Sequence, residues 1–262
     1  MSRVTNDTEY IVMKFTPVAL FASLFLAAGT AHSAALTIKF DNPIFGHFDS
    51  TPTSDTVKVS YTYGATPTTL TRNVMAGRFS GAASHLDGID PEIFVDSTGK
   101  VFMYCYDLFD TISGGQTVRY EVNFDGVAER TLDFLGAVNY VLNGNSNDWS
   151  DPHAWVHPVS GLQGAAIQLG IWESLYETGD AWSLDSGVLK ASDLAADTKS
   201  WLDKFFAAIP EADSLGKPYA MVFEAEGAQD MITADPPGTV PVPGSLALLA
   251  AGFAGLLVRR RG

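Results

Sequence analysis

Residues 101–108, Val-Phe-Met-Tyr-Cys-Tyr-Asp-Leu, place the strongest limit on how this chain can fold. A β-strand points alternate side chains to opposite faces. One face of this stretch would hold Val101, Met103 and Cys105, and the other would hold Phe102, Tyr104, Tyr106 and Leu108. Both sets are bulky and mostly apolar, so the sequence predicts a strand that other elements cover on both sides.

Several flanking segments alternate apolar and polar residues with a period of two, which is typical of half-buried antiparallel strands. The apolar positions are Leu36, Ile38 and Phe40; Val57, Val59, Tyr61 and Tyr63; and Val118, Tyr120, Val122 and Phe124. Gly114 and Gly115 precede the last of these segments and predict a hairpin with the 101–108 strand. Residues 74–91 are rich in Gly, Ser and Asp, so we expect a loop there with at most one short strand.

Three later segments have the apolar spacing of helices. The first begins near Thr131 and ends at Asn143, the second is centred on Gln168, and the third runs from Ser192 to Pro210. A last strand is expected over residues 220–224. Strands followed by helices predict an α+β fold, with an antiparallel β-sandwich or barrel-like part and a small helical part.

The N-terminus has the pattern of a secretory signal peptide, which we assign to residues 1–35. Lys14 precedes an apolar run over residues 15–28, and small residues follow at 31–35. The expected extracellular domain is therefore residues 36–235. It holds 11 Lys and Arg against 28 Asp and Glu, and this acidity disfavours nucleic acid and anionic lipid as partners.

The C-terminal segment, residues 236–262, combines a Pro-rich linker, a short apolar stretch and terminal arginines. Its marker residues are Pro241-Val242-Pro243, the apolar run 246–258 and Arg259-Arg260-Arg261. This order resembles the PEP-CTERM sorting signal of Gram-negative bacteria. Family members carry Pro-Glu-Pro, and this chain has Val242 in place of the Glu. The resemblance implies transient inner-membrane contact, cleavage by an exosortase near Pro243 and delivery to the cell surface or extracellular matrix. The alternative is a plain C-terminal anchor helix, but 13 apolar residues are short of the ~20 that span a bilayer.

Cys105 is the only cysteine, which is unusual because exported proteins generally pair their cysteines. It indicates a free thiol, an intermolecular disulfide or a special bond. Gln168 lies in the middle of the apolar face of its predicted helix, where an unpartnered carboxamide costs roughly 1–3 kcal/mol. The amide could bond to a sheet edge or loop backbone, or the Cys105 sulfur could attack it, release ammonia and form a thioester.

The sequence around both residues resembles the thioester domains of bacterial surface adhesins. The matching residues are Tyr104 and Cys105 in the first motif, and Ile167, Gln168, Ile171 and Trp172 in the second. The family often has Thr where Ile167 stands, and residues 227–230 look like its closing segment. The resemblance implies that a Lys amine or a hydroxyl, on a surface protein or polysaccharide, attacks the Gln168 carbonyl and displaces Cys105. The protein would then be consumed in one turnover and would not be an enzyme.

His153 and His157 are the candidates for an accessory base or oxyanion stabiliser in this reaction. They lie between Pro152 and Pro158 rather than on a helix, so their spacing does not indicate a metal site. We expect no cofactor and no metal. Two alternatives remain open: a Cys105–His157 hydrolase with Gln168 as oxyanion donor, and a structural matrix protein whose cysteine is merely buried.

Overall fold

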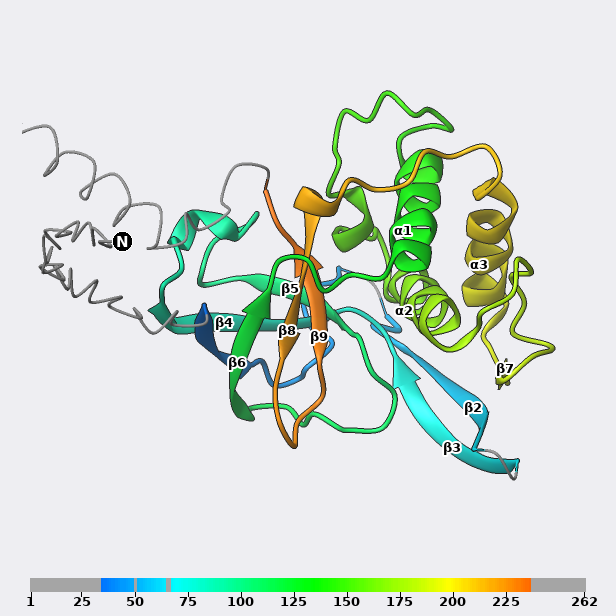
Figure 1. The fold of residues 1–262 in the computed structure, drawn as a ribbon, viewed down its shortest axis with the longest axis horizontal. Helices are drawn as coiled ribbons and strands as arrows, with labels where there is room; N and C mark the ends of the chain where they lie inside the picture. Colours follow the sequence, from blue (N-terminus) through cyan, green and yellow to red (C-terminus); the bar gives the residue numbers. More distant parts are fainter. Residues whose placement is uncertain (1–33, 50, 65–66, 237–262) are drawn as a thin grey trace, which may run out of the picture. The chain divides into compact units, whose positions relative to one another are not determined.

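The computed structural model describes residues 34–49, 51–64 and 67–236, and these form a mixed fold of strands and helices (Figure 1). The strands are β1 (Ala35–Phe40), β2 (Asp55–Tyr63), β3 (Thr68–Ala76), β4 (Phe79–Asp87), β5 (Val101–Cys105), β6 (Thr117–Asn123), β7 (Leu189–Ser192), β8 (Ala220–Glu224) and β9 (Met231–Ala234). The α-helices are α1 (Glu129–Leu142), α2 (Gly161–Tyr176) and α3 (Ala196–Ala208), and the short 3-10 helices are η1 (Pro91–Ile93), η2 (Ala154–Val156) and η3 (Lys217–Tyr219). The predicted α+β class, with its barrel-like part, is confirmed.

Six strands close into an antiparallel barrel in the order β1-β4-β5-β9-β8-β6. Strand β5 lies between β4 and β9 rather than beside β6, so the hairpin predicted from Gly114 and Gly115 is wrong. All five residues of β5 are buried, as the sequence predicts for a strand covered on both sides. Tyr104 illustrates the outer cover, because its ring stacks on that of Trp155 with centroids 6.0 Å apart. By strand alternation, Cys105 points to the opposite face of β5.

Strand β4 corrects the expectation that residues 74–91 form mainly loop, since it runs for nine residues inside that range. The small residues of β4 made the sequence look like a loop. A Cβ on Gly81 would lie 2.7 Å from the Lys39 carbonyl oxygen of the paired strand β1. The glycine therefore permits a close approach of two strands, which is a role that β-propensity does not predict.

A second, three-stranded antiparallel sheet has the order β3-β2-β7. Val57 and Val59 of β2 are buried, and α2 contacts all three strands of this sheet. The β2–β3 hairpin extends away from the helices (Figure 1). Residues 189–192, which the sequence gave no reason to treat as a strand, form β7 along the edge of β2.

The three α-helices lie together on one side of the barrel, and α2 packs against both α1 and α3 (Figure 1). Helix α2 begins after Ser160, whose hydroxyl accepts a hydrogen bond from the Gln163 N–H at 3.2 Å. Its residues are buried on nearly every side from Gly161 to Ser174. Other elements therefore enclose α2 on nearly all sides, and this enclosure places Gln168 deep in the domain.

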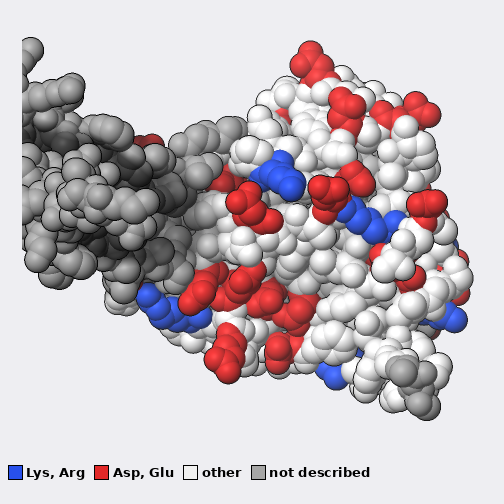
Figure 2. Space-filling view, in the orientation of Figure 1, with Lys and Arg blue, Asp and Glu red and all other residues white. Residues whose placement is uncertain are grey.

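Acidic side chains gather on the face of the barrel around β6, β8 and β9 (Figure 2). Glu121 and Glu224 lie directly opposite each other on β6 and β8, and Asn123 donates a hydrogen bond to Glu224 at 2.7 Å. Like charges in such a cross-strand pair repel each other. This face therefore disfavours an anionic partner, in agreement with the overall negative charge.

Candidate functional site

The fold brings Cys105 and Gln168 into direct contact although they lie 63 residues apart in the chain. The Cys105 N–H donates to Gln168 Oε1 at 2.8 Å, and Gln168 Nε2 donates to the Cys105 carbonyl oxygen at 2.8 Å. Cys105 is 2% exposed and Gln168 is 0% exposed. The two residues selected from the sequence therefore share one buried site.

The end of strand β4 explains why β5 accepts a side chain at this point. Pairing between β4 and β5 reaches only as far as Phe79 and Met103. Cys105, two residues further along β5, directs its N–H and C=O to the same side as Met103. The Gln168 carboxamide supplies the donor and acceptor that another β4 residue would have supplied. On the other side of β5, the Tyr106 N–H donates to the Asp230 carbonyl at 2.7 Å.

Helix α2 contacts the backbone at the end of β5 and in the segment that follows it, through residues spaced four apart, which lie above one another on one helical face. Gln168 bonds to Cys105, Trp172 Nε1 donates to the Asp107 carbonyl at 3.2 Å, and the Tyr176 hydroxyl accepts from the Leu108 N–H at 2.9 Å. The Gln and Trp of the second motif thus dock the helix along the strand that carries the cysteine.

The segment 227–230, for which the sequence offered no definite role, closes the site from the barrel side. Gln229 Nε2 donates to the Asp107 carbonyl at 3.0 Å, and the Gln229 carbonyl accepts from the Tyr120 hydroxyl at 3.0 Å. The Asp230 N–H donates to the Asp107 carboxylate. The sequence singled out this segment only by its resemblance and gave Gln229 no role, whereas the structure places its side chain against the residue two positions after Cys105.

Electrostatics keep the Cys105 sulfur in its neutral form. Burial raises the pKa of the Cys105 thiol well above its ordinary value, and the charge of Asp107 raises it further. The site therefore holds a thiol rather than a thiolate near neutral pH. Any reaction at the sulfur must move a proton along with the new bond.

His153 and His157 flank η2 and bind other groups. His153 Nε2 lies 3.2 Å from the Asp235 carbonyl oxygen, and His157 Nε2 lies 2.8 Å from Asp96 Oδ2. Burial lowers the pKa of His153. The His157 ring contacts Phe102, whose side chain lies on the opposite face of β5 from Cys105. Within residues 34–236 as described, no hydrogen bond or ion pair joins either histidine to Cys105 or Gln168.

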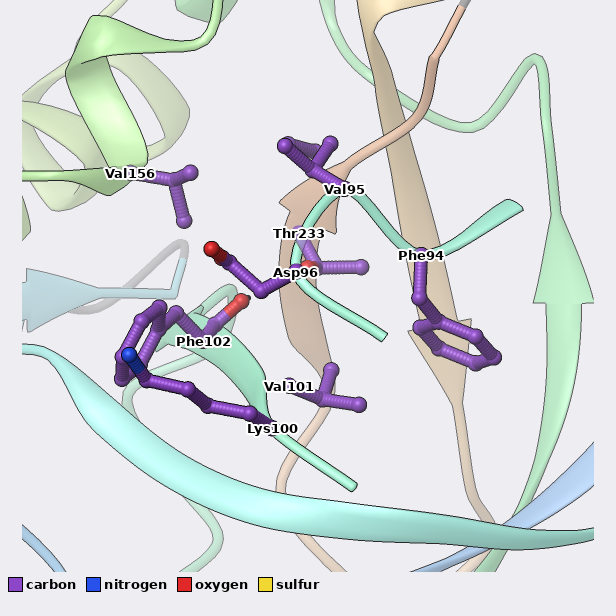
Figure 3. A pocket seen from close by; sticks show the side chains of 9 residues that line it. Phe94, Val95, Asp96, Lys100, Val101, Phe102, Val156 and Thr233 are labelled. Carbon is purple, nitrogen blue, oxygen red and sulfur yellow. Dashed lines mark hydrogen bonds between the residues drawn. The ribbon is translucent and has the colours of Figure 1, made fainter. Parts of the chain in front are cut away.

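A shallow pocket lies on this histidine side of β5 (Figure 3). The Lys100 side chain runs beside the Phe102 ring, with Nζ 4.9 Å from the ring centroid. The pocket volume is about 10 Å³, which is close to the space one water molecule needs. Among the described residues, no group of three or more His, Cys, Asp or Glu side chains is arranged to hold a metal ion.

Comparison with known families gives one match, at the C-terminus. The PEP-CTERM protein-sorting motif matches residues 239–261. The range includes the predicted sorting residues Pro241, Pro243 and Arg259 to Arg261, all of which lie outside the described residues, as does most of the predicted signal peptide. The protein is therefore an exported one, sorted to the cell surface of a Gram-negative bacterium after processing by an exosortase.

No curated protein and no solved structure matches the chain. Within the described part of the chain, no helix is long and apolar enough to cross a membrane.

Proposed function

We propose that Cys105 and Gln168 form an internal thioester, and that the exported protein uses it once to bind a partner covalently at the cell surface. The observation that supports this most directly is the two-point contact of the Gln168 carboxamide with the backbone of Cys105. Holding the two reacting groups in one place replaces an encounter in solution and can supply a large part of the barrier lowering.

The contact also suggests how the bond forms. The sulfur attacks the Gln168 carbonyl carbon, the carbon–nitrogen bond breaks, and the thiol proton leaves with the nitrogen as ammonia. Negative charge develops on Oε1 during the attack, and the Cys105 N–H already donates to that oxygen at 2.8 Å. This N–H is placed as an oxyanion donor, a role whose loss in enzymes costs roughly 100- to 1,000-fold in rate.

Burial suits a bond that must wait for a partner. Both residues are shielded from bulk water, which limits hydrolysis. The raised thiol pKa makes Cys105 a poor leaving group, because a thiol of lower pKa leaves faster. Burial and the raised thiol pKa together favour a long-lived thioester as long as the site stays buried.

The thioester would capture its partner by a second acyl transfer, in which Cys105 is the leaving group. An amine or hydroxyl of a surface protein or polysaccharide attacks the Gln168 carbonyl, the carbon–sulfur bond breaks, and the attacking group's proton goes to the sulfur. The products are an amide or ester at Gln168 and a free Cys105 thiol. One molecule of protein is consumed for each partner bound, and no contact described above gives His153 or His157 a part in it.

The test is the intact mass of freshly secreted protein, which should lie about 17 Da below the sequence value, the mass of one ammonia. Methylamine should then label Gln168 and free one thiol. Cys105→Ala and Gln168→Ala should show neither change. Gln163→Ala, which alters another buried glutamine on α2, should show both. A full mass together with a free thiol in fresh wild-type protein would refute the proposal.

A second candidate, a structural protein of the cell surface, has one observation in its favour. Both polar atoms of the Gln168 carboxamide have a hydrogen-bond partner in the intact amide, so the geometry is also stable without a thioester. A hydrolase gains less support, because the His157 ring contacts Phe102 on the opposite face of β5 from Cys105 and is therefore not placed to take the thiol proton. Turnover separates these alternatives: a hydrolase releases product repeatedly, a thioester reacts once, and the structural protein does not react.

A further inference from the structure

Two parts of the chain, helix α2 and the β8–β9 connection, hold the segment that directly follows Cys105. The Tyr106 N–H donates to the Asp230 carbonyl, and the Leu108 N–H donates to the Tyr176 hydroxyl. The carbonyl oxygen of Asp107, between them, accepts two hydrogen bonds, from Trp172 at 3.2 Å and from Gln229 at 3.0 Å. The Asp107 carbonyl oxygen, two residues after Cys105, therefore binds both helix α2 and the β8–β9 connection.

Gln229 makes the link from the barrel side. Its side chain donates to Asp107, while its own carbonyl accepts from the hydroxyl of Tyr120 on β6. Gln229 is 7% exposed and Tyr120 is 0% exposed. A buried residue bonded at both its side chain and its backbone has little freedom to shift, so Gln229 ties β6 to the end of β5.

The Asp107 carboxylate makes the anchored segment more rigid. It accepts hydrogen bonds from the N–H groups of Phe109 at 3.0 Å, Asp110 at 3.1 Å and Asp230. The backbone carbonyl oxygen of Asp107 has two lone pairs, and the bonds from Trp172 and Gln229 together satisfy both. Trp172 is also one helical turn from Gln168 on α2. Removing the Gln229 side chain would leave the Trp172 bond and the Asp230 bonds in place, but the Asp107 carbonyl would lose its donor from the barrel side.

We propose that Gln229 is a positioning residue for bond formation between Cys105 and Gln168. The inference rests on the proposed thioester. Gln229 does not touch the reacting atoms; it keeps the Cys105 N–H aligned with Gln168 Oε1 by restraining Asp107. Misplacement of a reacting group by 1 Å can cost on the order of 100-fold in rate. Loss of Gln229 should therefore slow the reaction in a protein that still folds.

The experiment compares Gln229→Met, which keeps the side-chain length but removes the donor, with Gln163→Met on full-length secreted protein. Gln163 is a matched control because it is also buried, and its Oε1 accepts one backbone hydrogen bond, from Val159 at 2.7 Å. The thioester is opened with ammonia in urea, which restores the carboxamide and the thiol. The protein is then refolded without ammonia, and the return of the 17 Da deficit, the mass of ammonia, is timed by mass spectrometry.

Gln229→Met should regain the deficit at least about tenfold more slowly than wild type, while Gln163→Met should stay within about twofold. Equal rates for Gln229→Met and wild type, or equal slowing in both variants at matched thermal stability, would reduce Gln229 to a structural residue. Gln229→Asn, which keeps the amide but shortens its reach, replaces Gln229→Met if that variant does not fold. It should also be slow.

Hydrogen exchange of the peptide that contains the Cys105 amide separates this inference from the thioester itself. Gln229→Met should speed exchange there, because the Cys105 N–H loses alignment with its acceptor, and Gln163→Met should not. If wild type never shows the deficit but exchange rises in Gln229→Met, the thioester is refuted and the positioning of Cys105 stands. Unchanged exchange overturns the positioning role in either case.

Discussion

The carboxamide of Gln168 completes the β-ladder beside Cys105, at the point where strand β4 ends. A helix side chain thereby takes the place of a strand residue, with both of its hydrogen bonds at 2.8 Å. A thioester would keep the acceptor Oε1 but lose the donor Nε2, so the Cys105 carbonyl would give up this partner when ammonia leaves. Stability and reactivity of the site are therefore linked through one side chain.

The ladder role predicts a stability loss that does not depend on any covalent bond. In a Cys105→Ala background, where no thioester can form, Gln168→Leu leaves the backbone N–H and C=O of residue 105 without partners. Each unpaired buried group costs roughly 1–3 kcal/mol, so the free energy of unfolding should fall by about 2–6 kcal/mol in urea titrations. Gln163→Leu in the same background removes one hydrogen bond and should cost about 1 kcal/mol. Equal losses in the two variants would contradict the ladder role.

Gly170 should resist substitution because a methyl group there would overlap the ring of Phe134 on α1. Phe134 is fully buried and packs against Trp182, Phe205 and Phe206, so its ring has little room to move. Gly170→Ala should lower the free energy of unfolding by roughly 1–3 kcal/mol, the usual cost of overpacking a core. Gly179→Ala is the control, because its new methyl group would meet no atom within 4 Å.

A double variant makes this explanation specific. Phe134→Leu should recover part of the loss caused by Gly170→Ala, because the smaller side chain makes room for the methyl group. Purely additive losses in urea titrations would show that the overlap is not the cause.

The contact between Cys105 and Gln168 could be predicted because two local signals agreed. A lone cysteine on a doubly covered strand needed an explanation, and so did a glutamine on an apolar helix face. Strand pairing was predicted wrongly: the hairpin expected through Gly114 and Gly115 does not form, because Met103 of β5 pairs with Thr233 of β9. A period of two says which face is buried but not which strand lies alongside. The contact between Gln229 and Asp107 could not be predicted, because it depends on that long-range pairing.

The Cys105 thiol gives a prediction on pH. In Gln168→Ala, which cannot form the thioester, the folded thiol should react with iodoacetamide only slowly at pH 8, because burial raises its pKa well above the ordinary value. The native state keeps its proton where the unfolded state has lost it, so stability should fall as pH rises above about 9. Unfolding in urea should restore rapid labelling. Rapid labelling of the folded variant at pH 8 would contradict the burial of this thiol.

Glu173 predicts a second pH dependence on the opposite side of α2. Burial, with help from the charge of Glu177, raises its pKa to about 7, while a hydrogen bond from Ser183 and the charge of Arg130 lower it. Between about pH 4.5 and 7 the folded protein keeps a proton that the unfolded chain has released, so stability should fall with rising pH across this window and level off above it. Glu173→Gln should flatten the decline, as measured by urea titration at several pH values. Arg130→Met removes a charge that favours the ionised carboxylate, so it should extend the decline to higher pH. A decline of the same slope in Glu173→Gln and wild type would assign the pH dependence to another group.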